Sequence, residues 1–240
     1  MAQSSPQLDS PASCGTPESC LKTCYRDMQN KADPERASAM ARYMKNRFQY
    51  FGISSTERNL VFKPYRNPLL AFAKKGHLET ILLQTWAFDQ REMQYCGLEI
   101  LWAARKVYTT GTIDLIEKLI LRKSWWDTVD LLAAKAAGHW FSVFPEKKAA
   151  RIRRWTRHPD LWLNRSAILH QLGYKGNTDF ELMKKTILPH IHSKEFFLRK
   201  AIGWALRQYS RVNPQAVLEF VKEHDALSGL SKKEALRLIK

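Results

Sequence analysis

Trp162-Leu-Asn-Arg-Ser-Ala-Ile168 and Phe196-Phe-Leu-Arg-Lys-Ala-Ile202 are similar stretches of this 240-residue sequence, and their similarity decides the fold prediction. In both, an arginine is followed two residues later by Ala-Ile, and the stretches start 34 residues apart. Similar steps toward the N-terminus lead to further polar residues. The positions predicted to be equivalent in successive helical repeats are Gln94, Asp130, Arg165 and Arg199. A polar ladder of this kind is typical of the concave face of a helical solenoid, although chance alignment of helices would give the same spacing.

Helical patterns extend through most of the sequence. Apolar residues recur at helical spacing, as at Ile113, Ile116 and Ile120, and no stretch shows the sustained alternation of a β-strand. Glycine and proline occur only 10 times each, which disfavours the many tight turns of a β-sandwich or barrel. We therefore predict an all-α fold of about a dozen helices, arranged as a superhelical solenoid of helical repeats.

Several helix starts are indicated by their capping residues. Proline follows Asp33, Phe144 and Asn213, and proline is favoured in the first helical turn. Capping boxes, in which a hydroxyl and a glutamate three residues later bind each other's backbone, are predicted at Thr178–Glu181 and Ser231–Glu234.

The ends and the cysteines suggest a simple organisation. Residues 1–16 are rich in Ser, Pro, Ala and Gln and are predicted to be a disordered tail, with one repeat domain over residues 17–240. No apolar run approaches the ~18 residues of a membrane span, and no secretory signal is evident. No histidine lies near the three N-terminal cysteines, so we expect reduced thiols rather than a zinc site.

The net charge of +16 is concentrated in the predicted domain, because residues 1–30 carry a net charge of −1. A body this basic is typical of proteins that bind nucleic acid or, alternatively, an anionic membrane surface. The densest basic stretch is predicted to be an amphipathic helix that binds phosphates, although a solvated face is the ordinary alternative. The predicted DNA contacts in this stretch are Lys147, Lys148, Arg151 and Arg154, of which all but Lys148 share one helix face.

The adjacent tryptophans Trp125 and Trp126 suggest a specific site. Neighbouring helix positions point about 100° apart, so both rings cannot face the core equally. Asp130 lies one turn after Trp126, and an aromatic face beside a carboxylate favours a cation. The alternative is an ordinary acidic first turn of a helix. The tryptophans expected in the core by default are Trp86, Trp102, Trp140, Trp155 and Trp162.

Four stretches resemble the DNA alkylation-repair glycosylases of the AlkD type: Met40–Asn46, Lys123–Asp130, Trp162–Leu169 and Ser193–Trp204. The resemblance runs from about residue 20 to the C-terminus, and Ser54–Arg58 departs from the family pattern. It implies a curved array of HEAT-like repeats that holds duplex DNA. It also implies excision of cationic bases such as N3-methyladenine, N7-methylguanine and bulky adducts, without deep base flipping and without a metal or organic cofactor.

The resemblance also implies roles for individual residues. Trp126, Asp130 and Trp204 match the catalytic cleft, Arg165 matches a DNA-backbone contact, and Tyr43 matches a residue beside the duplex. Asp130 would stabilise positive charge on the sugar and orient water, the tryptophans would pack on the deoxyribose, and Arg165 would bind a phosphate. Arg199 is predicted as a further DNA contact from its place in the repeat.

Two other functions fit parts of the pattern. One is a non-catalytic relative that binds branched or bent DNA, which the retention of Asp130 and of the cleft tryptophans disfavours. The other is a scaffold for protein partners, which the basic charge disfavours. We expect a monomer, since one concave DNA site needs no second copy, and a cytoplasmic protein associated with the nucleoid if the source is bacterial.

Overall fold

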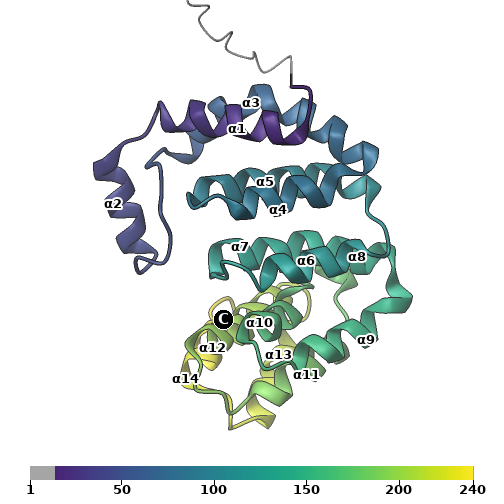
Figure 1. Ribbon diagram of the computed structural model, residues 1–240. Helices are drawn as coiled ribbons and strands as arrows, with labels where there is room; N and C mark the ends of the chain where they lie inside the picture. The colour runs from purple at the N-terminus through teal and green to yellow at the C-terminus, as the bar shows by residue number, and fades with distance from the viewer. Residues whose placement is uncertain (1–13, 240) are drawn as a thin grey trace, which may run out of the picture. The chain divides into compact units, whose positions relative to one another are not determined.

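The computed structural model describes residues 14–239 and is almost entirely helical (Figure 1). Helices account for 74% of the structure, and the described residues form no strand beyond an isolated bridge between Gln49 and Gln90. The all-α prediction is therefore confirmed. No helix within residues 14–239 combines the length and apolar character needed to cross a bilayer. The tail predicted for residues 1–16 lies outside the described residues except for its last three, of which Thr16 caps the first helix.

The chain divides into two compact units, Met1–Val107 and Tyr108–Lys240, a division that the sequence pattern does not indicate. The helices of the first unit are α1 (Pro17–Gln29), α2 (Pro34–Tyr43), α3 (Ser55–Phe72), α4 (Leu78–Ala87) and α5 (Arg91–Ala103), with the short π-helix η2 (Ala73–His77) and the 3-10 helix η3 (Ala104–Val107). Figure 1 shows α1 and α3 as one layer and α4 and α5 as the next. Leu21 of α1, Phe62 of α3 and Ile81 of α4 are among the side chains buried in this unit.

Helix α2 stands apart from this core, because none of its residues is buried. Its place is set by the chain that follows it. Gly52 has a φ of +86° and lies against the backbone of Asp33 and Ala37, where a Cβ atom would collide. The buried carboxylate of Glu92 accepts hydrogen bonds from the backbone N–H groups of Phe51 and Gly52. A left-handed glycine and a buried acceptor thus attach an otherwise exposed helix to the first unit.

The second unit carries the remaining helices. They are α6 (Thr112–Ile120), α7 (Trp126–Leu131), the π-helical η4 (Leu132–Ala137), α8 (Gly138–Val143), α9 (Pro145–Thr156), α10 (Leu161–Leu169), η5 (Lys175–Asn177), α11 (Phe180–Ile187), η6 (Leu188–His190), α12 (Phe196–Tyr209), α13 (Pro214–Glu223) and α14 (Gly229–Ala235). Helix α10 is central: it packs on α7, α9 and α12, and every residue from Trp162 to Leu169 is buried. A helix that is buried all round, as this one is, belongs to the interior of its unit.

The predicted helix starts are confirmed in part. Pro34, Pro145 and Pro214 are each the first residue of a helix. Both predicted capping boxes are wrong. The carboxylate of Asp179 caps α11 in place of Thr178, and Ser228 caps α14 by accepting from the N–H of Ser231. An aspartate or serine at the true N-cap satisfies the free N–H groups first, and this leaves Glu234 available for other partners.

Candidate functional site

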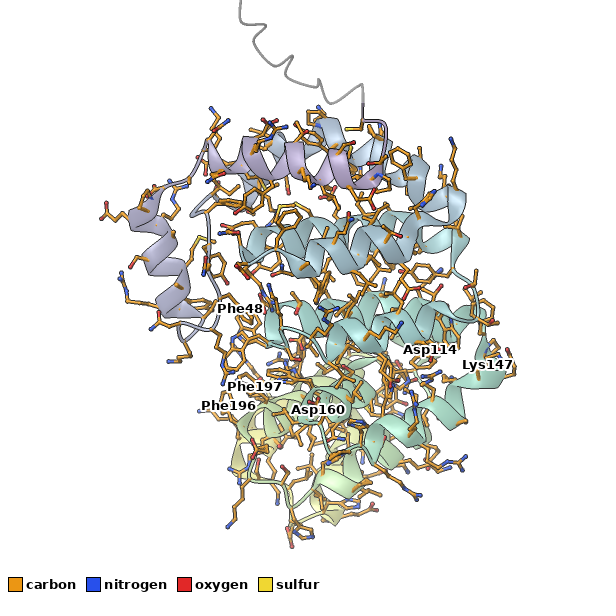
Figure 2. All side chains as sticks on the ribbon, in the orientation of Figure 1. Phe48, Asp114, Lys147, Asp160, Phe196 and Phe197 are labelled. Carbon is orange, nitrogen blue, oxygen red and sulfur yellow. The ribbon has the colours of Figure 1, made fainter. Side chains whose placement is uncertain are left out.

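An open pocket of about 320 Å³ lies in the second unit, between the starts of α7 and α12 and the facing sides of α10 and α14. It combines aromatic rings with five charged groups. Its lining residues are Trp126, Asp130, Arg165, Phe196, Phe197, Lys200, Trp204, Arg207 and Glu234. Figure 2 labels Phe196 and Phe197, the first two residues of α12. The three residues predicted to be catalytic, Trp126, Asp130 and Trp204, therefore line one pocket although they are far apart in the sequence.

Asp130 and Arg165 form a two-point ion pair at this pocket. The Nε and Nη2 atoms of Arg165 donate to the two carboxylate oxygens of Asp130 at 2.7 and 2.8 Å, and Nη1 donates to the carbonyl oxygen of Phe197 at 2.5 Å. The side chain of Asp130 is only 14% exposed and that of Arg165 only 5%. Each nitrogen of the guanidinium group thus has a partner within the unit, and Arg165 fixes the orientation of the carboxylate. A phosphate contact for Arg165 stays a prediction.

The environment of Asp130 has opposing effects on its ionisation. Burial raises the pKa of this carboxyl group above its usual range, and the hydrogen bonds and positive charge of Arg165 oppose that rise. Because Arg165 binds both oxygens of the carboxylate, each of the two side chains depends on the other for compensation of its buried charge. Loss of either partner would leave a buried charge without compensation.

The two adjacent tryptophans have different surroundings, as predicted. Trp125 is buried and its ring packs on Trp162 and Phe197, with centroid distances of 5.5 and 5.0 Å. Trp126 is half-buried and faces the pocket. Of the five tryptophans expected in the core, only Trp102 is not buried; it is 37% exposed beneath the guanidinium of Arg105. The ring face of Trp102 is thus covered by a cation and not by core side chains.

An ionic cluster that the sequence pattern does not predict lies on the side of the pocket formed by α12 and α14. Glu234 of α14 accepts a hydrogen bond from the ammonium of Lys200 at 2.7 Å and is also paired with Arg207. The hydrogen bond from Lys200 lowers the pKa of Glu234, and the charge of Arg207 adds to this effect. The incorrect prediction of a capping box at Ser231–Glu234 gave the glutamate a partner within its own helix, so its ion pairs with α12 were not predicted.

Two of the four positions in the predicted ladder, Gln94 and Arg199, are one residue out of register with the other two. Gln94, Asn164 and Arg199 each donate a side-chain hydrogen bond to the carbonyl oxygen six residues earlier, which belongs to Phe88, His158 and Ser193, respectively. These three positions are 70 and 35 residues apart. Gln94 and Arg199 are therefore equivalent to Asn164 and not to Arg165. Their side-chain hydrogen bonds stabilise the turn that precedes the helix.

The neighbouring register explains the charges of the pocket. Asp130, Arg165 and Lys200 follow one another at intervals of 35 residues, and all three line the pocket. The predicted ladder mixed these two registers because arginines at 165 and 199 looked equivalent. A constant spacing of 35 residues is the signal that would have identified Lys200.

The predicted cationic helix, α9, is partly neutralised by the unit's own acidic groups. As predicted, Trp155 is buried on its inner side. Arg151 is paired with Asp114 and Glu117 of α6, and Arg154 is also paired with Glu117. Both arginines thus have structural partners, which reduces the charge that this face presents to a polyanion. Their DNA contacts remain predictions.

The other predicted DNA contacts have varied surroundings. Lys147 is exposed and, with Asp114, lines a separate hollow of about 620 Å³; both are labelled in Figure 2. Lys148 is half-buried, and its charge helps lower the pKa of buried His170, which burial reduces to about 4. Tyr43, at the end of α2 in the first unit, is 72% exposed.

The cysteines contribute no group to the pocket. All four are free thiols. Cys20 and Cys24 on α1 and Cys96 on α5 are buried in the first unit, and burial is the main cause that raises the pKa of each. Thiols held in the neutral form in an apolar core are unreactive packing groups.

Gly203→Ala is expected to weaken the packing of α12 against α14, the helix that carries Glu234. A Cβ atom at Gly203 would lie 2.5 Å from the Cβ atom of Glu234 and 3.0 Å from the carbonyl oxygen of Ser231, so α12 and α14 must separate. We expect a loss of about 1–3 kcal/mol in the free energy of unfolding, measured by urea denaturation. Gly173→Ala, where an added Cβ atom meets nothing within 4 Å, is the control. Equal stability of the two variants would contradict this close packing.

The fold and the pocket define an all-helical protein with a buried ion pair beside the aromatic side chains that line the pocket. The chain belongs to the DNA alkylation repair enzyme family, whose sequence model matches residues 25–239. It is also similar to a solved structure from Enterococcus faecalis, described as a predicted DNA alkylation repair enzyme. The two are 31% identical with a TM-score of 0.79, over 87% of this chain and 96% of the other. No curated protein sequence matches the chain.

Proposed function

We propose that this protein is a monofunctional DNA glycosylase that excises cationic alkylated purines, such as N3-methyladenine and N7-methylguanine, from duplex DNA. Membership of the DNA alkylation repair enzyme family supports action on damaged DNA. The observation that carries the finer proposal is the oriented carboxylate of Asp130 in a pocket with Trp126 and Trp204. A π face beside a carboxylate stabilises positive charge, and positive charge distinguishes these lesions from normal bases.

The reaction requires little acid catalysis. An alkylated purine already carries a positive charge, so when the glycosidic bond breaks its electron pair passes to the base nitrogen and the base leaves neutral. Positive charge then develops on the deoxyribose. Water adds to the anomeric carbon and loses a proton. A catalyst for this step must stabilise the sugar cation and position the water, and both are tasks for a fixed carboxylate.

In this proposal the ion pair sets the position of the catalytic carboxylate. Arg165 occupies one hydrogen-bonding direction on each oxygen of Asp130, and each oxygen retains acceptor capacity for the sugar or for water. Trp126 and Trp204 provide the apolar surface for the deoxyribose. The pocket is open, so the base need not enter a closed cavity. Arg165 is a positioning residue here, in addition to any contact with a phosphate.

The direct test is release of free base. Wild-type protein incubated with a duplex that contains one N7-methylguanine is expected to release the methylated base, while unmodified guanine in the same duplex stays bound. Base release is measured by chromatography, and strand integrity before alkali treatment tests for the monofunctional reaction. Tight duplex binding without base release would contradict the glycosylase and favour a non-catalytic DNA-binding protein.

A further inference from the structure

Lys200 is the most exposed of the three cations that line the pocket. Its side chain is 40% exposed, compared with 21% for Arg207 and 5% for Arg165. All three guanidinium nitrogens of Arg165 donate to groups of the protein, whereas among residues 14–239 the ammonium of Lys200 donates to Glu234. An ammonium group carries three donors. Lys200 thus combines an anchored position with donors that a ligand in the pocket can use.

Glu234 holds this ammonium group from the neighbouring helix α14. One oxygen of its largely buried carboxylate accepts from Lys200 at 2.7 Å, and the other is paired with Arg207. The two helices pack closely at Gly203, where an added Cβ atom would collide with Glu234. The carboxylate is therefore fixed relative to α12, and Arg207 remains its partner when Lys200 also contacts a ligand.

The place of Lys200 on α12 puts it between two aromatic residues of the pocket. It lies one turn after Phe196, which Figure 2 labels, and one turn before Trp204, and residues four apart share a helix face. In the proposed function the deoxyribose packs on Trp204. A deoxyribose within a strand carries a phosphate on each side, so a phosphate of that sugar comes within one helical turn of Lys200.

The charges of the pocket fall into two groups with different sums. Asp130 and Arg165 compensate each other, so the first group is neutral. Lys200 and Arg207 share the single carboxylate of Glu234, so the second group has two positive charges and one negative, a net charge of +1. A nucleotide with an alkylated purine has a cationic base and an anionic phosphate. The second group suits the anionic part.

We propose that Lys200 binds a phosphate next to the damaged nucleotide and that Glu234 positions its ammonium group for this contact. The inference rests on the proposed function, in which the pocket acts on a nucleotide of duplex DNA. Asp130 then meets the positive charge that develops on the sugar, and Lys200 meets the negative charge of the phosphate. A lysine binds phosphate as a point charge, so this contact supplies affinity and position without reading the base sequence.

Lys200→Gln and Lys184→Gln form a matched pair of variants, because each removes one positive charge from a lysine that is paired with a glutamate in the second unit. Lys184 is 30% exposed, is paired with Glu181 within α11 and does not line the pocket. For Lys200→Gln we expect about 10-fold weaker binding to duplex DNA at low salt, and a plot of log affinity against log salt that is shallower by about 0.9. Lys184→Gln should bind like wild type, and Lys200→Arg should restore the salt dependence.

Glu234→Gln tests the positioning role separately. This variant keeps the charge of Lys200 but removes the anion that holds it, so the salt dependence of binding should be as steep as in wild type. Single-turnover excision of N7-methylguanine should fall by about 10-fold, because a displaced phosphate contact misaligns the sugar with Asp130. All rates and affinities are measured at a temperature at which each variant is folded, as melting curves establish.

Equal affinity and equal salt dependence of Lys200→Gln and Lys184→Gln would overturn the phosphate contact. Excision by Glu234→Gln at the wild-type rate would overturn the positioning role. Lys200→Gln should melt close to wild type because Glu234 keeps Arg207 as a partner, and a fall in melting temperature that accounts for its binding loss would also contradict the proposal. Failure of the proposed function gives a different result, because wild type itself would then release no N7-methylguanine.

Discussion

Asp130→Asn is expected to reduce excision of N7-methylguanine by about 100- to 1000-fold while duplex binding is retained. Asparagine matches aspartate in shape but lacks the negative charge that, in the proposed function, stabilises the sugar cation. Single-turnover base release measures the chemical step, and a fluorescence titration with unmodified duplex measures binding. Excision close to the wild-type rate would remove Asp130 from the mechanism.

The structure shows which controls this experiment needs. Asp130→Asn also leaves the buried guanidinium of Arg165 without its anion, so the loss of activity must be separated from a loss of stability. The double variant Asp130→Asn with Arg165→Met removes both charges and should be folded but inactive. Asp127→Asn changes the same charge on the same helix outside the pocket and should be active. An inactive Asp127 variant would point to a general effect of charge on α7.

Arg165→Met is expected to give the largest loss of stability, with a characteristic dependence on pH. Removal of one member of a buried ion pair costs about 3–5 kcal/mol, equivalent to a fall of roughly 6–20 °C in melting temperature for a protein of this size. Without Arg165, nothing opposes the effect of burial, so the pKa of Asp130 rises further above that of the unfolded chain. A raised carboxyl pKa penalises the folded state above the unfolded pKa of about 3.9, and the penalty grows until the folded pKa is passed.

The melting temperature of Arg165→Met should therefore approach that of wild type as the pH falls from 8 to 5. The acid limb of its excision rate should also move to higher pH, because the carboxylate is protonated more easily. Addition of Asp130→Asn to this variant should recover most of the stability and abolish the pH-dependent difference. A stability difference that is constant from pH 5 to 8 would show that Arg165 contributes by packing and not through the charge of Asp130.

The sequence predicts those parts of the fold and site that depend on local pattern. Helix starts at Pro34, Pro145 and Pro214 depend on the chemistry of a single turn, and the separation of Trp125 from Trp126 follows from the geometry of one helix. The pairing of Asp130 with Arg165 joins two helices, and no local pattern encodes it.

The cluster around Glu234 was missed for a related reason. The local sequence suggests only a capping box within α14 for this glutamate, whereas its ion pair to α12 depends on tertiary packing. The division of the chain at residue 107 likewise depends on contacts far apart in the sequence. The residues that matter most for the proposed chemistry are thus set by helix packing, with Lys200 the exception that a strict 35-residue spacing would reveal.

The burial of α10 from Trp162 to Leu169 has a consequence for the time scale on which the pocket persists. Proteins open locally, and the segments that exchange their amide hydrogens last are those with the most buried contacts. Arg165 lies in the middle of such a segment, so the group that orients Asp130 belongs to the slowest-opening part of its unit. In the proposed function, the protein would therefore meet its substrate with the carboxylate already oriented, and no reorganisation of the ion pair would have to accompany each encounter.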